Sequence, residues 1–174
     1  TPSDFDKMLA HGTILARFAG KDEWGPRALG NRSIISDPRS VEVISRLNHV
    51  IKQRDFWMPF APAILEEDQS RYLSKPHFSP YMTEGFLTKP EAREISATVH
   101  PADHTTRPMT VNDWNKPFQS ILRAFKKKTG VGGVLNTSFN LHGYPMVGTP
   151  RHALWTFQNS GLDGLLLNDW YINK

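Results

Sequence analysis

The chain has 174 residues and a mass of 19.8 kDa, a size that suits one folded domain with a real hydrophobic core. Its 39% hydrophobic content excludes a disordered chain, and the absence of Cys excludes disulfides and thiolate metal sites. Lys and Arg outnumber Asp and Glu by 21 to 17, a mild excess of positive charge that favours an anionic ligand.

The first half of the chain alternates helical and extended patterns. Ser3 can cap a short helix that Gly12 closes. Apolar residues at helical spacing after Pro38 predict an amphipathic helix over 40–51. The other elements expected here are strands at 13–18, 32–36 and 60–65 and a short helix at 66–73.

The second half continues the alternation. Residues 81–88 and 95–99 are predicted to pair as a hairpin around the break at Lys89 and Pro90. The remaining elements are a helix over 118–125 that ends at Gly130, a buried strand at 131–135, a helix capped by Thr149 and closed by Gly161, and a strand from 165. Together they predict one α/β domain with a mixed sheet.

Two loops stand out chemically: GKDEWGPRALGNRSIISDPR at 20–39 and LNTSFNLHGYPMVGTP at 135–150. Their Gly and Pro residues constrain the backbone, and their guanidinium and amide groups suit the binding of phosphate. We expect the two loops to form the halves of one anion site. The polar side chains concerned are Arg27, Arg32, Asn136, Ser138 and Asn140.

Four segments follow one another in an order that carries a family resemblance: the loop at 20–39, LNHVIKQRDFWMPFAP, HPADHTTRPMTV and the loop at 135–150. From about Leu9 to Lys174 the chain resembles the C-terminal domain of the O-carbamoyltransferases that include nodulation protein U and cephalosporin hydroxymethyl carbamoyltransferase. The resemblance implies an α/β (α+β) fold of the YrdC-like type, with a twisted mixed β-sheet flanked by helices, over residues 1–174. It also implies a partner, an N-terminal metal and acceptor domain, that is absent from this sequence.

The same resemblance implies an activity. Members bind ATP and carbamoyl phosphate, form a carbamoyl-adenylate and transfer the carbamoyl group to a hydroxyl acceptor in the N-terminal domain. Charge builds up on phosphate oxygens in such a reaction, so fixed cations and hydrogen-bond donors are the expected catalysts. The residues expected to be catalytic are Arg27, Lys52, Arg107 and Ser138, and those expected to bind the nucleotide are Arg54, Asn136, Asn140 and Arg32.

Each assignment has a local reason. Pro26 presets the backbone of Arg27, and Pro108 holds Arg107 extended. The resemblance implies a Lys-x-Arg signature at Lys52 and Arg54 and a Ser-x-Asn signature at Ser138 and Asn140. Purely structural roles stay open as alternatives: Arg32 could pair with Asp37 or Glu42, and Lys52 and Arg54 could be solvated charges at a helix end.

No protein metal site is expected. His100 and His104 flank Asp103, but Pro101 disfavours a helix there and no third ligand is evident. Mg²⁺ is expected only with ATP, held mostly by phosphates and water. The N-terminus has no signal-peptide pattern, and no run is long enough to span a membrane, so a cytoplasmic location is the default.

Four residues depart from the family pattern: Lys21 in place of Arg, Asp22 in place of Met, His104 in place of Gly, and Tyr144 in place of Glu. Tyr144 is expected to change the polarity beside the site. An RNA- or nucleotide-binding module without independent catalysis is the alternative function, since the pI is about 9.4. Nucleic acid is the weaker candidate, because the basic residues are not interleaved with aromatic residues as on a single-strand platform.

Overall fold

The structure is a computed structural model that describes residues 5–53 and 58–174. Two residues of the sequence predictions, Ser3 and Arg54, lie outside the described residues. Within the described part, seven strands form one sheet in the order β6-β3-β7-β2-β1-β8-β9. They are β1 (Leu15–Phe18), β2 (Arg32–Ser36), β3 (Ala61–Leu65), β6 (Met109–Val111), β7 (Gly133–Ser138), β8 (Gly164–Leu167) and β9 (Trp170–Asn173).

The sheet is mixed, because β1 pairs with β8 and β3 with β6 in parallel while the other neighbours are antiparallel. The α-helices are α1 (Phe5–Ala10), α2 (Glu42–Leu47), α3 (Gln69–Tyr72), α4 (Lys116–Thr129) and α5 (Pro150–Gln158). A π-helical turn, Asn48–Lys52, extends α2, and 3₁₀ segments span Glu66–Asp68, Pro90–Thr98 and Asp113–Asn115. A separate pair of short strands joins β4 (Phe86–Leu87) to β5 (Thr105–Thr106).

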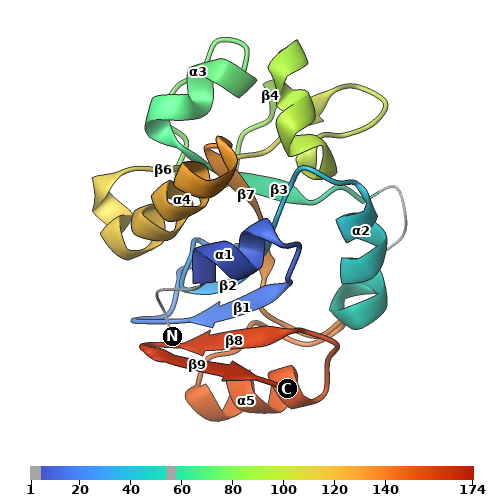
Figure 1. The fold of residues 1–174 in the computed structure, drawn as a ribbon, viewed down its shortest axis with the longest axis vertical. Coiled ribbons are helices and arrows are strands. Elements are labelled where there is room, and N and C mark those ends of the chain that lie inside the picture. Colours follow the sequence, from blue (N-terminus) through green and yellow to red (C-terminus); the bar gives the residue numbers. More distant parts are fainter. Residues whose placement is uncertain (1–4, 54–57) are drawn as a thin grey trace.

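Helices cover both faces of the sheet (Figure 1). One hydrophobic cluster joins α1 and α4 to a sheet face through Leu9, Phe118 and Leu122. The other cluster joins α2 and α5 to the opposite face, with Leu47 and Phe157 buried in it. Successive apolar residues of β1, β2, β7 and β8 alternate between the two clusters, as the pleat of a strand requires. The predicted class, a twisted mixed sheet flanked by helices, is therefore confirmed.

Several predicted elements are confirmed in detail. Helix α4 ends at Gly130, whose φ of 78° is the left-handed geometry expected of a helix-terminating glycine. Thr149 caps α5, since its hydroxyl accepts the backbone N–H of His152 at 3.2 Å. The helix predicted over 40–51 is present as α2 and its π-helical extension.

The predicted hairpin of 81–88 with 95–99 is wrong. Residues 95–99 fall mostly within the 3₁₀ segment Pro90–Thr98, and only Phe86–Leu87 of the first strand is extended, paired with Thr105–Thr106. Met82 has a φ of 55°, which no strand can include. Among the described residues, no helix has both the length and the apolar character needed to cross a membrane.

Candidate functional site

The carboxyl end of β7 lies in the middle of the sheet, between β2 and β3. Asn136 on this strand is buried, and its Nδ2 donates to the carbonyl of Ala28 at 2.8 Å. Ala28 directly follows Arg27, so this hydrogen bond joins the two polar loops that the sequence singled out. Their predicted proximity is therefore a feature of the structure.

Lys52 lies behind the end of β7 and is only 2% exposed. Its Nζ donates to the backbone carbonyl and the Oγ of Ser138, and to Oδ1 of Asn140 at 2.8 Å. Ser138 Oγ donates in turn to Asn140 Oδ1 at 2.7 Å. The structure thus brings Lys52 to Ser138 and Asn140, which lie 86 and 88 positions further along the sequence. The alternative of a solvated helix-end charge is wrong for Lys52.

The π-helical turn sets the position of Lys52. Its carbonyl oxygens are satisfied by neighbours: His142 Nδ1 lies 2.8 Å from the carbonyl oxygen of Lys52, and the Gly161 N–H donates to Val50 at 2.9 Å. Gln53 then leaves the helix in left-handed geometry, with φ of 44°. Such turns are rare and often occur at functional sites.

Arg32 belongs to the scaffold of the first loop rather than to its ligand-facing side. It is buried, donates to the carbonyls of Ala19 at 2.7 Å and Gly20 at 3.2 Å, and stacks on the ring of Phe18 at 3.7 Å. Its ion-pair partner is Asp22 at 2.7 Å, not Asp37 or Glu42. Arg32 was predicted to bind the ligand together with Arg27, but unlike Arg27 it lines neither of the two hollows described below.

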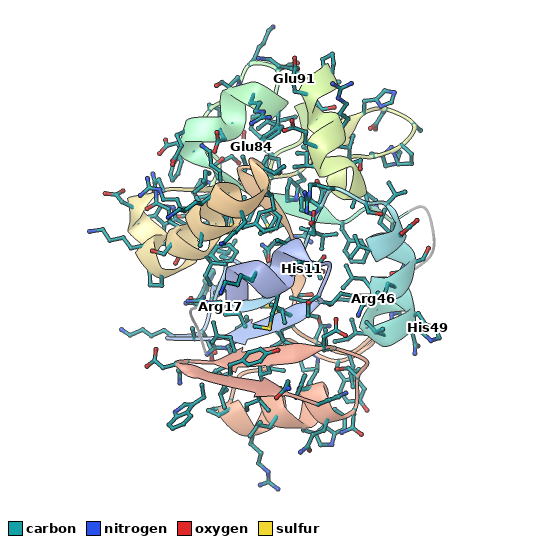
Figure 2. The ribbon with its side chains drawn as sticks, viewed as in Figure 1. His11, Arg17, Arg46, His49, Glu84 and Glu91 are labelled. Carbon is teal, nitrogen blue, oxygen red and sulfur yellow. The ribbon has the colours of Figure 1, made fainter. Side chains whose placement is uncertain are left out.

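Glu23 and Arg17 close the same loop. Glu23 accepts the backbone N–H of Asn31 at 2.6 Å and that of Arg32 at 3.2 Å, while burial raises the pKa of its carboxyl. Arg17 donates to the carbonyl of Gly30, and burial lowers its pKa to about 10. Figure 2 labels Arg17, which lies on β1. These contacts fix both ends of the segment that presents Arg27.

Arg27 and Arg107 line one cavity of about 370 Å³, which we call the arginine cavity. Asn136, Thr137 and Ser138 from the end of β7 line it as well. Lys52 is not among the lining residues but contacts Ser138 from behind. Apolar and small residues form another part of the lining: Pro26, Ala28, Met58, Pro59, Phe60, Ala61, Met82 and Gly85. A size of this order is typical of small-molecule sites.

The two arginines repel each other. Burial lowers the pKa of Arg107 below its usual value, and the nearby cation of Arg27 lowers it further. Two neighbouring positive charges raise the electrostatic energy of the ligand-free protein, and an anion bound between them would cancel this repulsion. The arrangement therefore favours a ligand with two or more anionic oxygens, such as a phosphate.

A broader groove of about 1240 Å³ adjoins the arginine cavity, since Pro26 and Arg27 line both. Aromatic side chains rim the groove, among them Trp24, which is 98% exposed, and Trp114. A ligand held at Arg27 can thus extend from one hollow toward the other.

Sequence reasoning missed several residues of the arginine cavity. His100 lines it, together with Thr98, Thr105 and Thr106. His100 drew attention only as a metal ligand, although the run from His100 to Arg107 was a signal that these side chains share a loop. Among the described residues, no group of three or more His, Asp or Glu side chains is placed to hold a metal ion.

Three of the four departures from the family pattern have separate structural consequences. Asp22 pairs with the scaffold residue Arg32. His104 adopts a φ of 55°, the left-handed geometry that glycine tolerates best. Tyr144 does not line the arginine cavity; its ring packs on Trp155 of α5 with centroids 5.7 Å apart, and its carbonyl accepts from Asn140 Nδ2 at 2.7 Å.

Comparison with known proteins places the chain in a family. The family model described as carbamoyltransferase C-terminus matches residues 6–174. The nodulation protein NolNO of Sinorhizobium fredii is 37% identical over 172 residues, covering 97% of this chain and 25% of its own length. The 3'-hydroxymethylcephem-O-carbamoyltransferase of Amycolatopsis lactamdurans is 33% identical over 175 residues, covering 98% of this chain and 33% of the relative.

The fold is also shared with a solved structure, full-length HypF in the phosphate- and nucleotide-bound form. The TM-score is 0.64 at 17% identity, over 96% of this chain and 24% of HypF. The chain belongs to the carbamoyltransferase C-terminal family, an enzyme family. It spans 28% and 34% of the length of two relatives from Methanocaldococcus jannaschii, so the relatives are about three times as long.

Proposed function

We propose that this chain is the activating domain of an O-carbamoyltransferase. It binds ATP and carbamoyl phosphate and forms carbamoyl-adenylate. Water first cleaves carbamoyl phosphate into carbamate and phosphate, and carbamate then reacts with ATP to give carbamoyl-adenylate and pyrophosphate, so the atoms of the reaction balance. The observation that carries the proposal is the meeting of Arg27, Arg107 and Ser138 at one cavity, with Lys52 directly behind it.

Each group has a role in this proposal. A carbamate oxygen attacks the α-phosphorus while pyrophosphate leaves, and negative charge grows on the phosphate oxygens. Arg27 and Arg107 neutralise that charge, and each guanidinium can donate two parallel hydrogen bonds to phosphate. Lys52 holds Ser138 and Asn140 in place and adds a buried positive charge close to the reacting atoms.

The remaining parts follow from the lining of the cavity. Met58, Pro59 and Phe60 offer an apolar wall against which a nucleobase or ribose can pack. Mg²⁺ would be held by the nucleotide's own phosphates and water, because the described carboxylates form no metal cluster. The acceptor hydroxyl would bind in an N-terminal domain, which would correspond to the extra length of the longer relatives. That domain is the proposed partner.

The test is carbamoyl-phosphate-dependent exchange of labelled pyrophosphate into ATP, measured on a full-length relative with the substitutions at equivalent positions. We expect Arg27→Ala and Lys52→Ala to reduce exchange by about 100-fold or more, as the loss of a charge-stabilising group does. Arg151→Ala is the matched control, since Arg151 is exposed on α5 and lines neither hollow. Unchanged exchange in both site variants would remove these residues from the reaction.

A further inference from the structure

His100 stands on a closed loop next to Arg107. The His100 N–H donates to the carbonyl of Thr105 at 2.8 Å, and the His104 N–H donates back to the carbonyl of His100 at 3.0 Å. Asp103 Oδ1 accepts the Thr105 N–H at 2.9 Å and the Thr105 hydroxyl at 2.7 Å. The loop backbone is therefore fixed before any ligand binds.

The imidazole ring has a defined orientation within this loop. His100 Nδ1 accepts the backbone N–H groups of Ala102 at 3.3 Å and Asp103 at 3.4 Å. A neutral ring that accepts these two N–H groups through Nδ1 carries its proton on Nε2. A protonated ring donates from Nδ1 to the Asp103 carboxylate at 3.2 Å and also carries a proton on Nε2. Both arrangements offer an N–H on the edge of the ring that faces away from the loop.

Because Nδ1 is turned toward the loop, the Nε2 edge is the one available to the arginine cavity. His100 lines this cavity together with Arg27 and Arg107. The side chain is 31% exposed, so the ring is neither buried in the core nor free in solvent. Three donors from two separate loops thus surround one small volume. An N–H donor beside two repelling guanidiniums is what an oxygen-rich anion requires.

We infer that His100 is a ligand-binding residue that donates its Nε2–H to a phosphoryl oxygen of the substrate held between Arg27 and Arg107. The inference rests on the proposed function for the identity of the substrate, a phosphoryl compound. The competing view is that His100 only stabilises its own loop through Nδ1. The two views differ in which ring nitrogen matters.

Two substitutions separate the nitrogens. In His100→Asn the side-chain amide can reach the position of Nδ1 but not that of Nε2, whereas His100→Gln can place a donor near Nε2. We expect His100→Asn to bind pyrophosphate and carbamoyl phosphate about 10-fold more weakly in calorimetric titrations of the 174-residue chain, as the loss of one hydrogen bond to a charged group does. His100→Gln should stay within about threefold of the original chain.

The controls make the result decisive. His152→Ala, an exposed histidine on α5, should leave binding unchanged. If His100→Asn binds like the original chain while Arg107→Ala loses binding, the inference fails and the proposed function stands. If neither variant changes binding, both fail.

A direct measurement covers the case in which a variant does not fold. Proton–nitrogen correlation spectra of the original chain should show the proton of His100 on Nε2, and its signal should shift when pyrophosphate is added. A ring protonated on Nδ1 and not on Nε2, or an Nε2 signal that does not respond to pyrophosphate, would overturn the inference.

Discussion

Arg27 and Arg32 lie five positions apart in one loop, yet their surroundings differ. The Arg32 guanidinium donates to backbone carbonyls, pairs with Asp22 and stacks on the ring of Phe18, whereas Arg27 is exposed and lines both hollows. Both are arginines two residues after a glycine, Gly25 and Gly30, so this local feature could not separate a scaffold role from a cavity-lining one. What separates them is tertiary: Asp22, two backbone carbonyls and the ring of Phe18 contact the Arg32 guanidinium, whereas Arg27 lines the two hollows.

This contrast predicts opposite effects on stability and binding. Arg32→Met should lower the free energy of unfolding by about 2–4 kcal/mol, because it leaves the part-buried carbonyls of Ala19 and Gly20 without their donor and the carboxylate of Glu23 without a nearby cation. Arg27→Ala should change stability by less than about 0.5 kcal/mol, since an exposed arginine that repels Arg107 is removed. Urea unfolding of both variants measures the two effects. Similar losses for the two would contradict the division into scaffold and ligand-binding arginines.

At the scale of elements, the sequence predicted the helices that apolar periodicity and capping residues define. The helix ending at Gly130 and the Thr149 cap rest on local chemistry and are confirmed. The strands β6 and β9 escaped prediction, and 95–99 was mistaken for a strand, because short apolar runs do not reveal their pairing partner. The π-helical end of α2 was also invisible in the sequence, since His142 and Gly161 that complete it come from far along the chain.

The closed loop from His100 to Thr105 contains a strained residue, and this gives a prediction about stability. His104 has a φ of 55°, a geometry that costs an ordinary residue roughly 1 kcal/mol and glycine almost nothing. His104→Gly should therefore raise the free energy of unfolding by about 0.5–1 kcal/mol, after the greater freedom of glycine in the unfolded chain is subtracted.

His104→Ala is the matched control, because it removes the imidazole but keeps the unfavourable backbone. It should give no gain in a thermal or urea unfolding experiment. Equal stabilisation by glycine and alanine would show that the side chain, and not the backbone geometry, sets the energy of this loop.

At the scale of the molecule, the sheet order explains how distant segments meet. Strand β7 is central, with the loop of Arg27 preceding its neighbour β2, and the π turn of Lys52 preceding its other neighbour β3. The sequence predicted that these loops share a site because their chemistry matched, and the structure brings Arg27, Arg107, Asn136 and Ser138 to one cavity. The sequence could not predict that His100 lines the cavity, since the orientation of its imidazole ring depends on the hydrogen bonds of the closed loop.

The distribution of charge over the molecule also predicts a nucleotide rather than a nucleic acid as ligand. A net charge of +4 attracts the many phosphates of RNA only weakly, whereas the arginine cavity places two guanidiniums around one small volume. We expect the 174-residue chain to bind ATP with less than about tenfold loss of affinity between 50 and 200 mM salt, roughly what two screened charges allow. A protein that holds RNA by six or more phosphates would lose about a thousandfold over the same range. Fluorescence titrations with labelled ATP and a labelled single-stranded RNA measure both slopes, and Arg107→Ala should weaken ATP binding alone. Tight, steeply salt-dependent binding of RNA that Arg107→Ala leaves intact would favour the nucleic-acid module instead.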